Sequence, residues 1–244
     1  MPSASVWRQP RAVKRPVVEL PKRTKLLFLI LVLAGLFLTS PHIDVLYLGC
    51  QETKAAEIVG SWVSGTTHTA ETGSNRALIF TAHVEHSSTV NITGVTYGGQ
   101  SMTKITDHNY AGTATAYVAA FVLDEAGIAA ATSSDFAITW ESPPTETPAY
   151  SSVFLQNVYQ TTLLGDTATG GSTTSTAETA AVSTNADDMA VVAATCGTDA
   201  EYSTLNSFTE AVELAPSNAD GICGYLAGTG GSVTPGVSHT SVDH

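Results

Sequence analysis

The chain has 244 residues, of which 43% are hydrophobic and only 13% charged, and its formal net charge is −12. A chain of that length can bury a core of its own without metals or disulfides. The acidic balance excludes a typical nucleic-acid-binding domain, which needs a basic patch, and the many Thr residues argue against a mostly helical fold because Thr favours strands.

The charge is divided unevenly along the chain. Residues 1–25 hold seven of the ten basic residues and a single acid, whereas residues 26–244 hold three basic residues and 21 acids. We expect residues 1–25 to form a basic arm and residues 56–244 to form one acidic domain.

Between these parts, residues 26–38 read LLFLILVLAGLFL and contain no polar side chain. A helix from residue 21 to residue 40 would be about 30 Å long, enough to cross a membrane, and Lys22, Arg23 and Lys25 could reach the headgroups. We therefore expect a single transmembrane anchor within residues 26–48. The positive-inside rule then leaves the arm in the cytoplasm and the acidic domain in the periplasm or outside the cell. A cleaved export signal stays open as an alternative, because its apolar core has this length.

Residues 56–244 show short apolar alternations separated by clusters of turn-forming residues. This pattern predicts an all-β domain, an antiparallel β-sandwich of about 10–11 strands that is jelly-roll-like. Gly98-Gly99 predicts a tight hairpin, residues 124–132 are the only helical candidate in this domain, and residues 165–176 are expected to form a polar loop or an edge crossing. The expected strands are 57–63, 76–85, 90–97, 100–106, 113–123, 135–141, 149–157, 179–184, 188–196, 207–214 and 221–227.

Alternation also assigns the faces of the strand at residues 76–85. One face carries Leu78, Phe80, Ala82 and Val84 and is expected in the core. The opposite face, with Ile79, Thr81, His83 and Glu85, is expected in solvent. Residues 117–123 and 189–195 are apolar on both faces, so a partner protein, an extra layer, or burial between the sheets must cover them.

Four segments resemble poorly characterised β-sandwich modules of bacterial surface and phage proteins: SNRALIF, ITGVTYGGQSMTKI, SVFLQNVYQTTLLG and ADDMAVVA. The resemblance covers roughly residues 56–242 and implies an interaction role without known chemistry. Such modules start a final apolar strand near His244, so an open sheet edge that invites a neighbouring chain is expected. The matching residues are Asn75, Arg76, Tyr97, Gly98, Gly99, Met102, Thr103, Val158 and Gln160.

No motif indicates catalysis, since a Gly-x-Ser-x-Gly elbow is missing and the His residues lack a partner motif. His83 and His86 would point to opposite faces of a strand, which disfavours a metal site. We expect no cofactor, with calcium held by loop carboxylates as the exception to consider. The calcium candidates are Asp187, Asp188, Asp199 and Glu201. For Asp187 and Asp188, the competing explanation is that they form a turn before a strand.

Two further groups of residues have open roles. Cys196 and Cys223 are candidates for a disulfide in an oxidising compartment, or else two buried free thiols. Trp62, Tyr110 and Trp140 are candidate ligand-stacking aromatics, or else core and sheet-edge residues.

Together these features predict a non-enzymatic, membrane-anchored structural or accessory subunit. Its sandwich would dock on other protein subunits of a membrane or envelope assembly, its N-terminal helix would contact lipid, and no nucleic acid would bind. The alternatives are a glycan-binding adhesin module and a self-assembling extracellular filament or appendage subunit.

Overall fold

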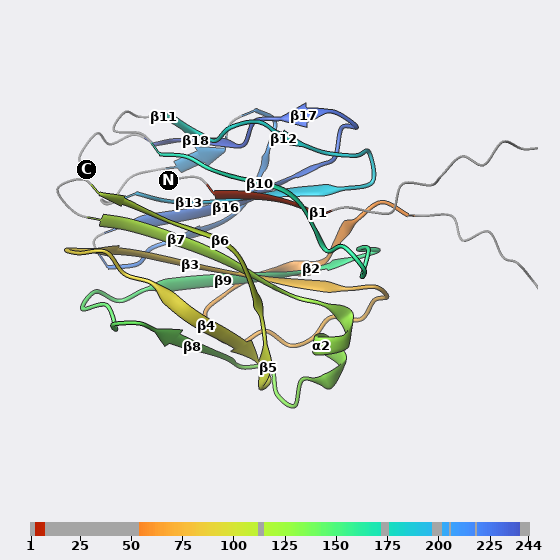
Figure 1. The fold of residues 1–244 in the computed structure, drawn as a ribbon, viewed down its shortest axis with the longest axis horizontal. Coiled ribbons are helices and arrows are strands. Elements are labelled where there is room, and N and C mark those ends of the chain that lie inside the picture. Colours follow the sequence, from red (N-terminus) through yellow and green to blue (C-terminus); the bar gives the residue numbers. More distant parts are fainter. Residues whose placement is uncertain are drawn as a thin grey trace, which may run out of the picture. The chain divides into compact units, whose positions relative to one another are not determined.

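The computed structural model describes residues 3–7, 54–111, 115–171, 176–196, 202–204, 206–217 and 219–239 (Figure 1). In this part of the chain the sheets are all antiparallel and only one short helix occurs, which confirms the all-β prediction. No helix among these residues is long and apolar enough to span a membrane. The expected anchor at residues 26–48, with Lys22, Arg23 and Lys25 beside it, lies outside the described residues.

The elements follow in chain order. They are β1 (Ser3–Trp7), β2 (Glu57–Ser64), β3 (Ala77–His86), β4 (Ile92–Tyr97), β5 (Gln100–Ser101), β6 (Thr103–Ala111), β7 (Thr115–Leu123), α2 (Glu125–Ala130), β8 (Phe136–Trp140), β9 (Ala149–Gln156), β10 (Leu164–Thr169), β11 (Thr176–Glu178), β12 (Val182–Ser183), β13 (Met189–Cys196), β14 (Tyr202–Thr204), β15 (Thr209–Leu214), β16 (Asp220–Ala227), β17 (Ser232–Val233) and β18 (Gly236–His239).

The first large sheet has the order β2-β9-β3-β7-β6, and a small sheet, β5-β4-β8, covers one of its faces. The main aromatic core lies between these two sheets. Leu78, Phe80, Ala82 and Val84 of β3 all belong to it, as predicted from their alternation. This packing places the small sheet as an outer layer of the fold.

Two local predictions are confirmed. Gly98 and Gly99 connect β4 to β5 with φ values of 53° and 82°, the positive φ pair that a two-residue type I′ hairpin turn needs. Helix α2 begins after Asp124, whose carboxylate accepts the N–H of Gly127 at 2.7 Å and so caps the helix.

The other face of the first sheet is not solvated, which corrects the prediction for Ile79, Thr81 and His83. All three are fully buried, because a second large sheet, β10-β1-β13-β16-β15, packs on that face (Figure 1). Ile79 packs in one cluster with Val191 of β13. The alternation of residue types along β3 shows that the two faces of the strand differ. It does not show that other sheets cover both faces.

The outer face of this second sheet is covered in turn by β12, β17 and β18 (Figure 1). Val182, Val233 and Val237 pack there against Ala190 and Val192 of β13. The sheets therefore stack in more layers than the two expected, and the chain itself supplies the cover for its two-sided apolar strands. Residues 165–176, expected as a loop, contribute most of β10.

Candidate functional site

The most distinctive feature of the described chain is the origin of β1. Ser3–Trp7 lies between β10 and β13 and is antiparallel to both. Ser5, for example, is paired with Thr167 on one side and with Val191 on the other. The structure thus departs from the expected boundary of a separate arm at residues 1–25, because its first strand belongs to a sheet of the sandwich. We call the space between β10 and β13 the strand slot.

The side chains of β13, on one side of the strand slot, pack into two layers of the core. On β13, Met189 and Val191 face the first sheet, while Ala190 and Val192 face the outer layer. Since β1 is antiparallel to both neighbours, β10 and β13 run in the same direction. Two strand spacings separate them, which corresponds to about 10 Å. Without a strand in the slot, both would present unpaired backbone N–H and C=O groups.

A buried polar cluster joins the two large sheets near the C-terminal end of β13, beyond the residues that pair with β1. His83 of β3 has its Nδ1 at 2.9 Å from Thr195 Oγ1 and 3.1 Å from the carbonyl oxygen of Ala194, both on β13. Its Nε2 lies 3.0 Å from Thr81 Oγ1. Gly221 of β16 makes room for the ring, since a Cβ there would come within 2.8 Å of His83 Nδ1.

Cys223 of β16 completes this cluster. Its Sγ lies 3.6 Å from His83 Nε2 and 3.3 Å from Ser151 Oγ. Burial lowers the pKa of His83 to about 3 and raises the pKa of Cys223 to about 11. Both groups are therefore neutral at neutral pH, and the pair acts as a hydrogen-bonded link between sheets rather than as a thiolate and an imidazolium.

Residues of the sequence resemblance meet in a second cluster, at the start of α2. The guanidinium of Arg76 forms a forked ion pair with Glu125, which also accepts the backbone N–H of Arg76 at 2.6 Å. Gln160 accepts the N–H of Glu125 at 2.9 Å and donates to the carbonyls of Arg76 and Val158. The hydrogen bonds with Arg76 hold the pKa of Glu125 below its usual range. These motif residues tie β3, α2 and the segment after β9 together, so they have structural roles.

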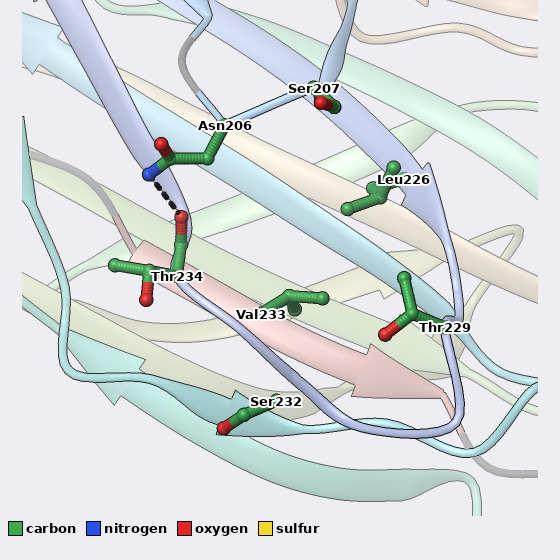
Figure 2. Close-up of a pocket in the computed structure, with 7 residues that line it drawn as sticks. All are labelled: Asn206, Ser207, Leu226, Thr229, Ser232, Val233 and Thr234. Carbon is green, nitrogen blue, oxygen red and sulfur yellow. Dashed lines mark hydrogen bonds between the residues drawn. The ribbon is translucent and has the colours of Figure 1, made fainter.

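The described residues also line a shallow surface hollow of about 430 Å³. Figure 2 shows hydroxyl groups and two apolar side chains around it, and the amide of Asn206 donating to the carbonyl oxygen of Thr234 at 2.8 Å. It contains no charged and no aromatic side chain, so it offers no stacking platform for a sugar ring. The lining residues are Asn206, Ser207, Leu226, Thr229, Ser232, Val233 and Thr234.

The candidate stacking aromatics lie in different places. Trp62 packs between the two large sheets, against clusters that include Val118 and Cys223. Trp140 packs on the main core with its ring 5.8 Å from that of Tyr117. Tyr110 is half-buried on β6. The structure does not bring the three together, and for Trp62 and Trp140 it favours the packing explanation.

Cys196 and Cys223 are both buried and are not joined by a disulfide. They lie on paired strands, but Cys223 is opposite Ala193, and Cys196 is opposite Asp220. A shift of three residues along a strand is about 10 Å, beyond the Cα separation that a disulfide allows. The sequence places the two cysteines on neighbouring strands but does not give their register.

The metal candidates have other roles where they are described. Asp187 and Asp188 lie in the turn before β13, and the carboxylate of Asp188 accepts the N–H of Asn185 at 2.6 Å. His83 and His86 lie apart, since His86 contacts Ser88 and Glu146 instead. Asp199 and Glu201 lie outside the described residues. Within the described ranges, no three His, Cys, Asp or Glu residues are grouped as a metal ion would require.

No family model, curated protein or solved structure matches this chain. The site therefore has to be understood from its own geometry. Sequence reasoning missed β1 because the basic residues after it dominate residues 1–25. The alternation of Ser3 and Ser5 with Ala4 and Val6 is a period-two signal that could have indicated a short strand.

Proposed function

We propose that the chain is a non-catalytic structural or accessory subunit of a membrane or envelope assembly. Its sandwich docks on partner proteins outside the cytoplasm, and residues 26–48 anchor it in the membrane with residues 8–25 at the cytoplasmic face. The observation that carries the proposal is the strand slot, because pairing with an added strand is a common way for one protein to hold another.

The charge of the described body supports a protein partner of basic character. Two of the three basic residues beyond residue 25 are engaged internally, Arg76 with Glu125 and Lys104 with Asp107 at 2.7 Å. The surface potential is therefore set mainly by carboxylates. Such a surface repels nucleic acid and anionic lipid and attracts a basic protein surface.

The test is to purify the full chain from membranes in a mild detergent and to measure the mass of the particle. The proposal predicts a complex well above the 25.3 kDa of one chain, containing a second polypeptide in a fixed ratio. An isolated monomer would contradict it. For the anchor, Leu31→Arg should move the protein out of the membrane fraction, because a charge at the centre of a span costs about 3 kcal/mol. The matched control Leu31→Ala should leave it there.

A second candidate is a self-assembling filament subunit, which is favoured by the same strand. A five-residue strand from a distant part of the chain can complete a neighbour's sheet as well as its own. Electron microscopy of the purified chain tests this directly, since regular filaments would support it and dispersed particles would reject it.

A further inference from the structure

The strand slot and the expected anchor place conflicting demands on the chain. β1 can lie between β10 and β13 only when residue 7 and residue 57 are on the same side of any membrane. A single crossing by residues 26–38 separates them. This step rests on the proposed function, because it takes the membrane span as given.

The tether between β1 and the body is long. Residues 8–53 lie between these two described parts, and a chain of that length can span at most roughly 150 Å, so its length alone does not hold β1 in the strand slot. While both ends are on one side, a tether of this kind keeps β1 near its slot at an effective concentration on the order of millimolar. Once the chain spans a membrane, that competitor is gone.

We propose that the strand slot is a docking site for an extended partner strand, and that Ser3–Trp7 can occupy it only when this strand and the sandwich lie on the same side of the membrane. In the anchored chain the slot accepts a strand of a partner protein, antiparallel to β10 and β13. The docked strand consists of small and β-branched residues and is followed by basic ones, as Ser3–Trp7 is followed by Arg8 and Arg11.

Two observations define this occupant. The backbone edges of β10 and β13 accept five residues in a fixed antiparallel register. The body around them is strongly acidic, so a strand flanked by basic residues is attracted, whereas an acidic one is repelled. Chains of the same kind are poor donors in the anchored state, because their own residues 3–7 lie across the membrane.

The experiment uses the full chain with two substitutions, Cys50→Ser and Thr167→Cys, the second at an exposed position of β10. Adding Ser5→Cys places two thiols at paired positions of neighbouring strands, about 5 Å apart between Cα atoms, which suits a disulfide. The pair Ser5→Cys with Thr103→Cys, in which position 103 lies on β6, is the matched control for random collision. The probe is a synthetic peptide of residues 1–10 with cysteine at position 5, and the control peptide also carries Ala4→Pro and Val6→Pro.

In detergent micelles, which impose no sidedness, the Ser5→Cys/Thr167→Cys chain should form an intrachain disulfide and the control pair should not. The same chain is then placed in phosphatidylcholine–phosphatidylglycerol vesicles, and protease protection verifies that the arm and the body lie on opposite sides. There the yield of the intrachain disulfide should fall by roughly tenfold or more. Capture of the peptide by Thr167→Cys, added on the side of the body, should rise correspondingly, and the proline peptide should remain at background.

Three results overturn the proposal, and they are distinguishable. If no intrachain disulfide forms in micelles, Ser3–Trp7 does not occupy the strand slot, and the proposed function then depends on its own test, the particle mass, alone. If the chain spans the vesicle membrane but captures both peptides equally, the slot is not a docking site. If protease reaches the arm and the body from the same side and the intrachain disulfide persists, residues 26–38 do not span the membrane. This result would also refute the membrane anchor in the proposed function.

Discussion

The two large sheets of this protein are built in different ways. The sheet β2-β9-β3-β7-β6 draws all its strands from residues 57–156 and packs on an aromatic core. The sheet β10-β1-β13-β16-β15 contains many small residues, such as Ala190, Ala193 and Gly221, and it includes a strand from the opposite end of the chain. The comparison teaches that the first sheet is formed by one contiguous stretch of the chain, while the second includes a strand that is distant in the sequence.

The largest expected effect is in the aromatic core. Phe80→Ala should lower the free energy of unfolding by about 4 kcal/mol, because Phe80 is fully buried and its ring contacts those of Phe136 and Tyr150. Val192→Ala in the second sheet should cost only roughly 2 kcal/mol, since it removes less apolar volume. Denaturant titration measures both, and equal losses would contradict the expectation that the larger buried side chain of the aromatic core contributes more.

The next largest effect concerns the link between the sheets. His83→Ala should cost about 3 kcal/mol, because it leaves the hydroxyls of Thr81 and Thr195 without their ring partner and opens a cavity. His86→Ala, on the same strand but half-exposed, is the control and should cost about 0.5 kcal/mol.

The same histidine predicts an acid-sensitive stability. Burial lowers the pKa of His83 from its ordinary value of 6.5 to about 3 in the folded protein, so the unfolded chain binds more protons between these two pH values. The His83 contribution is complete above pH 6.5 and is lost as pH falls toward 3. Thermal melting from pH 7 to pH 4 should show a steeper decline in the native chain than in His83→Ala. Parallel curves would show that His83 does not titrate in this way.

A smaller and local effect is expected at β1. In detergent micelles, Ser5→Pro removes a backbone donor from a strand that is paired on both sides, and it should cost about 2 kcal/mol in the second sheet. Amide hydrogen exchange should accelerate in β10 and β13 but not in β3 and β7. Ser5→Ala is the control and should leave all four strands unchanged.

The smallest effect is expected at the cluster of Arg76 and Glu125. Glu125→Gln keeps the shape of the side chain but removes the charge of a partly exposed pair, so the loss should be about 1 kcal/mol. Because the pKa of Glu125 is lowered in the folded state, this contribution is present above pH 4.5 and disappears as pH falls further. Melting at pH 7 and pH 3 should therefore separate the variant from the native chain only at pH 7.

The sequence predicts the first sheet far better than the second. Alternation and the Gly98-Gly99 turn give the strands and the core face of residues 76–105, because those signals are local. Whether Thr81 and His83 face water or another sheet depends on residues more than a hundred positions away, which alternation cannot register. The partners of β1 could not be predicted for the same reason, since the pairing of Ser5 with Val191 has no local signature.

The most direct test of the central claim is residue-resolved hydrogen exchange along β13 in the full chain. Successive residues of an inner strand bond alternately to its two neighbours, so every second amide from Met189 to Ala193 bonds to β1 and the amides between them bond to β16. Our account predicts that in micelles all of them exchange slowly. An alternation of slow and fast amides along Met189–Ala193 would mean that the strand slot is empty and would contradict the account.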